Sequence, residues 1–401
     1  MSISVVIPTH NRLDLLKQAI STVIKQELDD VELVIYDNFS RKELGEYIKS
    51  LKNKKIIYDR SDKFLSVTES WNNAINLATK SYVILIGDDD GILPGGLKKM
   101  RQLIDQYQSP DLIYSSIIQF FHPGVAPWNM NGYVMHVKNG SFFKNASIPF
   151  FLNKKNRILS VKDSIRLNRS FSFNMQAFIF KKEFLEKIKV NGKVFHSPFP
   201  DYYIANVAFY WAKNILISPF PFAIQGVSKL SFGFTLFNNL EREGEALLNN
   251  RTQKDKVYQD KKNLIFPGKH YNTKYVITMQ YVVNNTKTHE IFHVNFSKYR
   301  LLQLIELFLT MQYSILESLV CDKGIRNNHK VTFFERFFIS CLLFSNKHKF
   351  FKKYIVMKVI YGINMTRVSA NIDMIDSGNF NDTYDIFRRF SYGHDNSINF
   401  S

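Results

Sequence analysis

Three adjacent carboxylates, Asp88, Asp89 and Asp90, directly follow the apolar run Tyr82 to Ile86. Like charges side by side repel one another, and a cation between them removes that cost. Mg²⁺ and Mn²⁺ prefer oxygen ligands, and they usually complete their shell with water and substrate phosphates. The triplet therefore predicts a divalent-cation site. A solvated acidic turn that caps the next helix is the alternative interpretation.

Another carboxylate, Asp37, ends the apolar run Val31 to Tyr36. At the end of a strand such a side chain can accept a hydrogen bond from a nucleobase or a ribose, or it can form an Asx turn. Thr9 and Asn11 follow the first apolar run, where they are also suited to cap a helix. Neither GxGxxG nor GxxxxGK[ST] occurs in this region, so a dinucleotide fold or a P-loop would lack its phosphate cradle.

Short apolar runs alternate with helical periodicity over the first hundred residues, and these elements would position the polar side chains. Strands are predicted at residues 3–7, 31–36, 56–58 and 82–86. Helices are predicted from residue 13 to 24 and from 67 to 78. This alternation is typical of a parallel sheet that is covered on both faces. Ligands of such sheets bind outside the carboxyl ends of the strands, where all three polar clusters lie.

The chain as a whole is predicted to have three regions: residues 1–100, 101–235 and 236–401. The second contains aromatic, strand-like pieces and proline-rich loops, and the third is mostly helical, with an apolar face over residues 301–309. We therefore predict an α/β fold with a doubly wound, mostly parallel sheet and a helical C-terminal region.

Composition excludes several classes of protein. The formal charge is +18, but residues 1–100 hold 14 basic and 14 acidic side chains, so no nucleic-acid partner is expected. Two cysteines are too few for a disulfide scaffold or a thiolate zinc site. The chain shows neither a signal-peptide pattern nor an uncharged apolar run of spanning length. These features favour a cytoplasmic protein, or one attached peripherally to the inner face of the cell membrane.

The motifs of the first hundred residues together resemble glycosyltransferase family 2. The resemblance rests on Val5–Arg12, Asp37–Ser40, Trp71–Ala74 and Ile84–Asp90, the last followed by Leu93-Pro94. Their order and spacing agree with the family pattern. The resemblance implies a GT-A fold, a nucleotide-sugar donor with a UDP-sugar favoured, Mn²⁺ or Mg²⁺ at a DXD-type motif, and inversion at the anomeric carbon.

The same resemblance implies donor-binding roles by position. Thr9 and Asn11 would flank the pocket for the base, which Asp37 would contact. Asp88 would lie near the ribose and the donor sugar. The metal would be held mainly by Asp89.

Asp90 would stand beside that ligand, among the donor-binding residues. An inverting transfer also needs a general base that takes the proton from the acceptor hydroxyl. The family usually offers a Glu-Asp-Tyr type motif at the start of a helix, and Phe199 to Tyr203 resembles it. Asp201 is therefore the predicted catalytic residue, although a helix cap is an equally simple explanation for it. Asp163 has the same ambiguity.

Residues 323–358 carry nine basic side chains and one acidic side chain among seven phenylalanines. Lysines at 347, 349, 352 and 353 alternate with apolar residues, as in a helix that lies on anionic lipid. A buried helical pair with a solvated face is the alternative. A nucleic-acid patch ranks last, because no recognised binding module accompanies the charge.

The sequence therefore favours a metal-dependent, inverting sugar transferase that extends a glycan or lipid-linked glycan, in bacterial surface polysaccharide synthesis. A sugar nucleotidylyltransferase is the second candidate, but it would need a glycine-rich loop with a basic residue where Pro8 to Asn11 stand. The third is a non-catalytic, basic membrane-binding protein on a degenerate GT-A fold. The presence of Asp37, Asp89 and Asp201 argues against it.

Overall fold

The computed structural model describes residues 1–26, 28–143, 146–249, 254–321, 331–347, 370–376, 380–392 and 398–400. Four strands at the start of the chain run parallel in the order β3-β2-β1-β4: β1 (Ile3–Thr9), β2 (Val31–Asp37), β3 (Ile56–Arg60) and β4 (Tyr82–Leu85). The associated helices are α1 (Leu13–Ile24), α2 (Lys42–Ser50), α3 (Val67–Asn76) and α4 (Gly96–Gln106). All four predicted strands and both predicted helices are confirmed.

Both faces of this sheet are buried, because side chains alternate along each strand. Val6 and Val34 belong to the apolar cluster that includes α3, whereas Ile7 and Ile35 pack with α1, α2 and α4. Burying one such side chain contributes about 1.5–3 kcal/mol relative to leaving it exposed. The predicted doubly wound arrangement is confirmed, and it leaves the carboxyl ends of β1, β2 and β4 at one edge.

The sheet continues past β4 in the order β10-β6-β11-β9, with β10 antiparallel to both of its neighbours. These strands are β6 (Leu112–Ser115), β9 (Phe150–Phe151), β10 (Phe178–Lys181) and β11 (Ile215–Ser218). A second sheet has the order β13-β8-β7-β12-β5. Its strands are β5 (Gly91–Ile92), β7 (Ile117–Phe121), β8 (Tyr133–Asn139), β12 (Ala223–Val227) and β13 (Ala370–Asp376). The antiparallel position of β10 brings the segment before it beside the end of β4.

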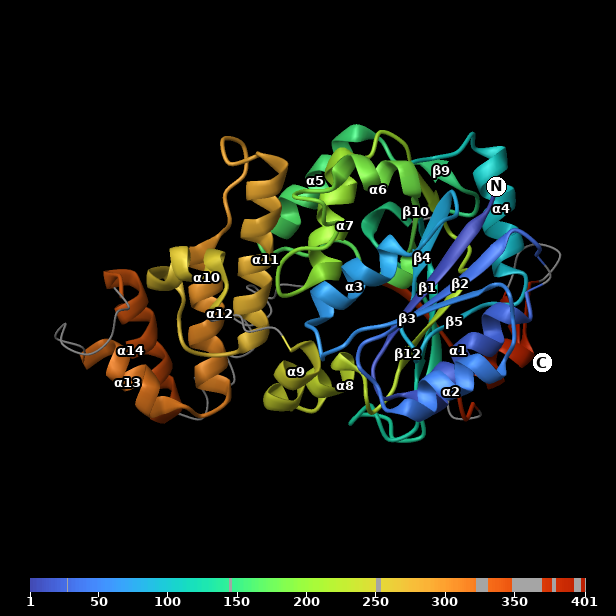
Figure 1. The fold of residues 1–401 in the computed structure, drawn as a ribbon. Helices are drawn as coiled ribbons and strands as arrows, with labels where there is room; N and C mark the ends of the chain where they lie inside the picture. Colours follow the sequence, from blue (N-terminus) through green and yellow to red (C-terminus); the bar gives the residue numbers. More distant parts are fainter. Residues whose placement is uncertain are drawn as a thin grey trace.

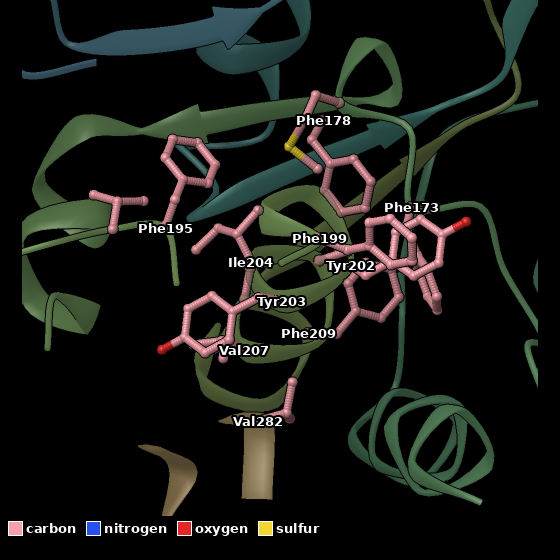
Figure 2. Packing of buried hydrophobic residues seen from close by; sticks show 14 of the residues in the cluster. Phe173, Phe178, Phe195, Phe199, Tyr202, Tyr203, Ile204, Val207, Phe209 and Val282 are labelled. Atoms are coloured by element: carbon pink, nitrogen blue, oxygen red, sulfur yellow. The ribbon is translucent and has the colours of Figure 1, made fainter. Parts of the chain in front are cut away.

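An aromatic core surrounds helix α7 (Pro200–Trp211), which begins with proline at a position where no backbone donor is needed. Phe171 and Phe209 stack with ring centroids 4.2 Å apart, and Phe173 meets Tyr202 edge-on at 4.7 Å. Figure 2 shows Phe173, Phe199, Tyr202 and Phe209 gathered around this helix. Because α7 is buried on nearly all sides, the position of its first turn is fixed.

The remaining helices complete the middle of the chain and build the C-terminal region. They are α5 (Lys154–Ile165), α6 (Lys182–Ile188), α8 (Phe232–Phe237), α9 (Glu241–Leu248), α10 (Lys256–Lys261), α11 (His270–Thr286), α12 (Phe296–Leu309), α13 (Tyr313–Cys321) and α14 (Phe333–Lys347), with short 3-10 helices at Ser141–Phe143, Met175–Ala177 and Lys262–Leu264. In Figure 1, α13 and α14 lie at the end of the molecule opposite α1, α2 and α4. The predicted apolar helix face over 301–309 is confirmed within α12.

A buried ion pair joins α12 to α14: Arg300 Nε lies 2.6 Å from Glu335 Oε1. Paired in this way, both charges are compensated inside the helical region. Within the described ranges, no helix is long and apolar enough to cross a membrane.

The end of the chain departs from the predicted helical region 236–401. β13 pairs with β8 of the second sheet, and α17 (Thr383–Arg389) packs against α1. β14 (Phe390–Tyr392) and β15 (Ile398–Phe400) form a further antiparallel pair. These strands escaped prediction from the sequence, because the strand that pairs with β13 lies more than two hundred residues earlier.

The basic stretch 323–358 is described only over residues 331–347, most of which form α14. Four phenylalanines on this helix are exposed: Phe333 by 87%, Phe334 by 64%, Phe337 by 62% and Phe344 by 57%. The predicted alternation at Lys349, Phe350, Phe351, Lys352, Lys353, Tyr354 and Ile355 lies outside the described residues.

Candidate active site

A cavity of about 930 Å³ opens at the carboxyl ends of β1 and β4. The acidic triplet Asp88–Asp90 lies on its wall, together with Thr9 and Arg12 from the end of β1. The wall also includes Asp201 at the start of α7 and the segment that follows β12. Figure 1 shows α8 and α9 beside this end of the sheet. Residues of both helices also line the cavity.

Asp88 is held by two groups from the end of β1. Thr9 Oγ1 donates to its Oδ2 at 2.8 Å, and Arg12 Nη1 donates to its Oδ1 at 3.0 Å. Burial raises the pKa of Asp88, and the positive charge of Arg12 opposes that rise. Arg12 also donates to the carbonyl of Leu230, so it ties β1 to the segment after β12. No role was predicted for Arg12, although it stands directly after the polar residues Thr9 to Asn11 at the end of the first strand.

Asp89 and Asp90 are bound from different parts of the chain. Ser228 Oγ donates to Asp89 Oδ2 at 2.8 Å, and Asp89 Oδ1 makes no hydrogen bond with the described residues. Asp90 accepts from the backbone N–H of Gly226 at 2.9 Å, and also from Gln176 and Gly87. Burial, with the neighbouring charge of Asp89, raises the pKa of Asp90 to about 8.

The oxygen ligands that the acidic triplet offers can be compared with those that a divalent cation needs. Both carboxylate oxygens of Asp88 already accept hydrogen bonds, from Thr9 and Arg12. The carboxylate of Asp90 accepts from three N–H groups. No cluster of three or more acidic, histidine or cysteine side chains in the described part of the chain could hold a metal alone. Asp89, however, lines the cavity with one carboxylate oxygen free of hydrogen bonds. This set fits a cation bound by Asp89 and by substrate phosphates, which is the usual mode for Mg²⁺ and Mn²⁺.

Gly226 lies directly against the backbone of the acidic turn, where only a residue without a side chain fits. A Cβ at this position would lie 1.8 Å from the carbonyl oxygen of Asp89. Because that contact involves backbone, Gly226→Ala is expected to displace the turn and to cost about 1–3 kcal/mol or more of stability. Thermal unfolding measures the loss. Gly233→Ala is the control, since its Cβ would meet only side chains at 3.3 Å or more. Equal melting temperatures for the two variants would contradict the steric argument.

Asp201 lies in the first turn of α7, directly after Pro200. It is partly buried, and it forms no ion pair with a described residue. Burial raises the pKa of Asp201 to about 7, against the effects of backbone N–H groups at the helix start and of the Arg169 charge. A carboxylate with this pKa can accept a proton near neutral pH. Asp163, the other predicted candidate, lies in α5 and is not among the residues that line the cavity.

Two predicted donor-binding residues, Asn11 and Asp37, do not line this cavity. Asn11 adopts φ of 54°, and its Oδ1 accepts from the backbone N–H of Arg41 at 2.9 Å. Asp37 is fully buried: Ser40 N donates to Oδ1 at 2.7 Å, and Tyr58 Oη donates to Oδ2 at 2.9 Å. Both side chains therefore tie together the loops after β1, β2 and β3. The predicted contact of Asp37 with a base stays a prediction.

Three residues of the site were not found from the sequence: Arg169 and Gln176, which line the cavity, and Ser228, which donates to Asp89. The first two belong to the segment between α5 and β10, and Ser228 follows β12. Each is at least 79 residues from the triplet in sequence. No local pattern marks them, so only the fold reveals their place.

Comparison with known proteins identifies relatives of the N-terminal part. Residues 4–178 match the model of Glycosyl transferase family 2. An uncharacterised glycosyltransferase of Methanocaldococcus jannaschii is 25% identical over 210 residues, which are 51% of this chain and 64% of that protein. A putative colanic acid biosynthesis glycosyl transferase of Escherichia coli is 34% identical over 97 residues, 24% of this chain and 35% of that protein.

A third relative is the GalNAc(5)-diNAcBac-PP-undecaprenol beta-1,3-glucosyltransferase of Campylobacter jejuni, 29% identical over 106 residues, 25% of this chain and 33% of that protein. The chain thus spans between a third and just under two thirds of the length of these curated relatives. Among solved structures, residues 1–349 of Staphylococcus aureus TarS in complex with UDP-GlcNAc align over 100% of this chain and 97% of that one, with 13% identity and a TM-score of 0.46.

The family match covers the strand ends, the acidic triplet and the segment that carries Gln176. It agrees with the parallel order of β1 to β4 and with the position of the cavity at their carboxyl ends. The predicted α/β, GT-A-like fold class is therefore confirmed. Residues 4–178 of this chain are thus similar to glycosyltransferase family 2 both in sequence and in the order of their strands.

Proposed function

We propose that this protein is an inverting, metal-dependent glycosyltransferase. It moves a sugar from a nucleoside-diphosphate sugar, with UDP-sugars favoured, to a hydroxyl group of a glycan or lipid-linked glycan. The observation that carries the proposal is that Asp89 and Asp201 line the same cavity. One wall thus offers a free carboxylate oxygen for a cation, and another offers a carboxylate suited to accept a proton.

The donor half of the proposal concerns the end of β4. Asp89 would hold Mn²⁺ or Mg²⁺, which when bound supplies positive charge against the leaving diphosphate. Thr9 and Arg12 fix the orientation of Asp88 toward the donor ribose and sugar. Ser228 fixes Asp89 in the same way. These contacts hold the donor side in place before substrate arrives.

The acceptor half concerns the start of α7. A carboxylate oxygen of Asp201 takes the proton from the acceptor hydroxyl as that oxygen attacks the anomeric carbon. The bond from this carbon to the diphosphate oxygen breaks on the opposite side, so the configuration inverts. A pKa of about 7 leaves a substantial fraction of Asp201 ionised at neutral pH.

The proposed process is the synthesis of a bacterial surface polysaccharide at the inner face of the membrane. The names of two relatives refer to colanic acid biosynthesis and to an undecaprenol-linked glycan. The exposed phenylalanines Phe333, Phe334 and Phe337 on α14 suit contact with a lipid surface. Peripheral attachment to anionic lipid is therefore part of the proposal.

A screen of nucleotide sugars tests the proposal. The protein is incubated with UDP-, GDP- and dTDP-sugars and Mn²⁺, and free nucleoside diphosphate is measured with and without EDTA. Release from at least one donor, lost in EDTA, is expected. Formation of a nucleotide sugar from nucleoside triphosphate and sugar phosphate would instead identify a nucleotidylyltransferase. Binding to anionic liposomes with no nucleotide binding would favour the non-catalytic alternative.

Asp37 provides the second prediction. If its carboxylate reads the base, Asp37→Ala should weaken binding of the nucleoside diphosphate about tenfold or more, with a smaller change of turnover at saturating donor. Calorimetry measures the affinity, and unchanged affinity would contradict the role. Tyr58→Phe is the matched control, because it removes the 2.9 Å hydrogen bond and keeps the carboxylate.

A further inference from the structure

Arg169 is a cavity residue that the proposed donor chemistry does not use. It lies between α5 and the short helix Met175–Ala177, and its side chain lines the cavity. Its Nη1 donates to Tyr202 Oη at 3.3 Å, and its guanidinium lies 5.7 Å from the ring centroid of Phe173. Its Nε is buried without a hydrogen-bond acceptor. No carboxylate of the described residues forms an ion pair with it.

Two other arginines of the chain, in contrast, each form an ion pair with a carboxylate. Arg12, on the wall of the same cavity, has Asp88 at 3.0 Å. Arg300, in the helical region, has Glu335 at 2.6 Å. Burying a charge costs free energy unless a counterion and hydrogen bonds compensate it. Arg169 therefore has a positive charge on the cavity wall that no ion pair with a described carboxylate neutralises.

The surroundings of Arg169 place it on the acceptor side. Its hydrogen-bond partner, Tyr202, directly follows Asp201 in the first turn of α7. Tyr202 in turn is fixed by Tyr271, whose hydroxyl lies 2.8 Å away, and by the edge of Phe173. The donor-side contacts of Thr9, Arg12 and Ser228 do not include Arg169. A ligand that brings a hydroxyl to Asp201 thus brings its neighbouring atoms toward this guanidinium.

We infer that Arg169 binds an anionic group, a carboxylate or a phosphate, carried by the acceptor beside the hydroxyl that Asp201 deprotonates. The inference rests on the proposed function, since it takes Asp201 as the mark of the acceptor side. A guanidinium forms paired hydrogen bonds with either oxyanion. The acceptor is then an acidic sugar or a sugar phosphate rather than a neutral glycan.

Calorimetry on the full chain, saturated with UDP and Mn²⁺, tests the inference. The probes are methyl glucuronide, methyl glucoside and inorganic phosphate, so that the two possible oxyanions are compared with a neutral sugar. We expect the wild-type protein to bind at least one anionic probe about 10- to 100-fold more tightly than methyl glucoside, the range of a charge-assisted hydrogen bond. The tighter anion identifies the source.

Three variants test whether Arg169 causes the preference for an anionic probe over methyl glucoside. Arg169→Gln should reduce it to about threefold or less and leave UDP affinity unchanged, whereas Arg169→Lys should keep part of it. Arg166→Gln, which removes an exposed charge from the same segment, should keep all of it. Because Arg169 forms no ion pair with a described carboxylate, its replacement by Gln should lower the melting temperature little, unlike the loss of an arginine in a buried ion pair.

The outcomes separate the two proposals. Absence of any anion preference in the wild-type protein, or an equal preference in Arg169→Gln, overturns the inference. A large loss of UDP affinity in Arg169→Gln also overturns it, because the residue would then bind the donor diphosphate. Failure of UDP, GDP and dTDP to bind the wild-type protein contradicts the proposed function instead, and phosphate titration of the free protein then still tests Arg169.

Discussion

Asp89→Asn is expected to lower metal-dependent turnover about 10³-fold or more and to leave the fold intact. The substitution keeps the size of the side chain and the acceptor for Ser228 Oγ, 2.8 Å away, but it removes the negative charge that would hold the cation. Loss of that charge removes the stabilisation of the leaving diphosphate. Turnover is measured as release of nucleoside diphosphate across a Mn²⁺ titration.

The control for this variant is Asp62→Asn, which neutralises an exposed carboxylate outside the cavity. It should keep full activity. Full activity of Asp89→Asn, or of the wild-type protein in EDTA, would contradict the metal role. A collapse of the melting temperature in Asp89→Asn would show instead that the carboxylate is structural.

Asp201→Asn is expected to lower turnover by about 10²–10⁴-fold, the range for a positioned general base, with donor and metal affinity unchanged. The pH profile gives an independent signature. Because the base acts in its ionised form, turnover should fall as the pH drops through the raised pKa of about 7. This acidic limb should disappear from the residual activity of the variant.

Asp163→Asn is the matched control for the base, since it changes the same residue type outside the cavity. Wild-type turnover in Asp201→Asn together with loss in Asp163→Asn would move the base to α5. Equal and full activity in both variants would contradict a carboxylate base at either position.

The sequence was informative about the N-terminal sheet because each strand there is a short, continuous apolar run between punctuating residues. The polar clusters at Thr9, Asp37 and Asp88–Asp90 follow those runs directly, so their place at one edge of the sheet could be predicted. Burial could not. Asp37 is buried outside the cavity lining, and its carboxylate is bonded to Ser40, Tyr58 and Arg60. These contacts depend on how three loops fold together, which the sequence does not reveal.

The remaining site residues escaped prediction because tertiary structure alone brings them to the triplet. Gln176 reaches Asp90 through the antiparallel strand β10, and Ser228 reaches Asp89 from the end of β12. Arg169 follows a helix that gives no chemical signal of its own. Asp201 could be singled out because Phe199 to Tyr203 resembles a motif of the family at the start of a helix, and its catalytic role stays a prediction. The return of β13 to the second sheet was missed for the same reason as Gln176.

The central claim, that one cavity has a metal-dependent donor half and a separate acceptor half, is tested most directly by calorimetric titration of UDP with Mn²⁺. The wild-type protein and Asp201→Asn should bind with equal affinity, and EDTA should weaken both. Asp89→Asn should bind weakly, with no response to EDTA. Equal binding by all three proteins regardless of Mn²⁺, or loss of UDP binding in Asp201→Asn, would contradict the account.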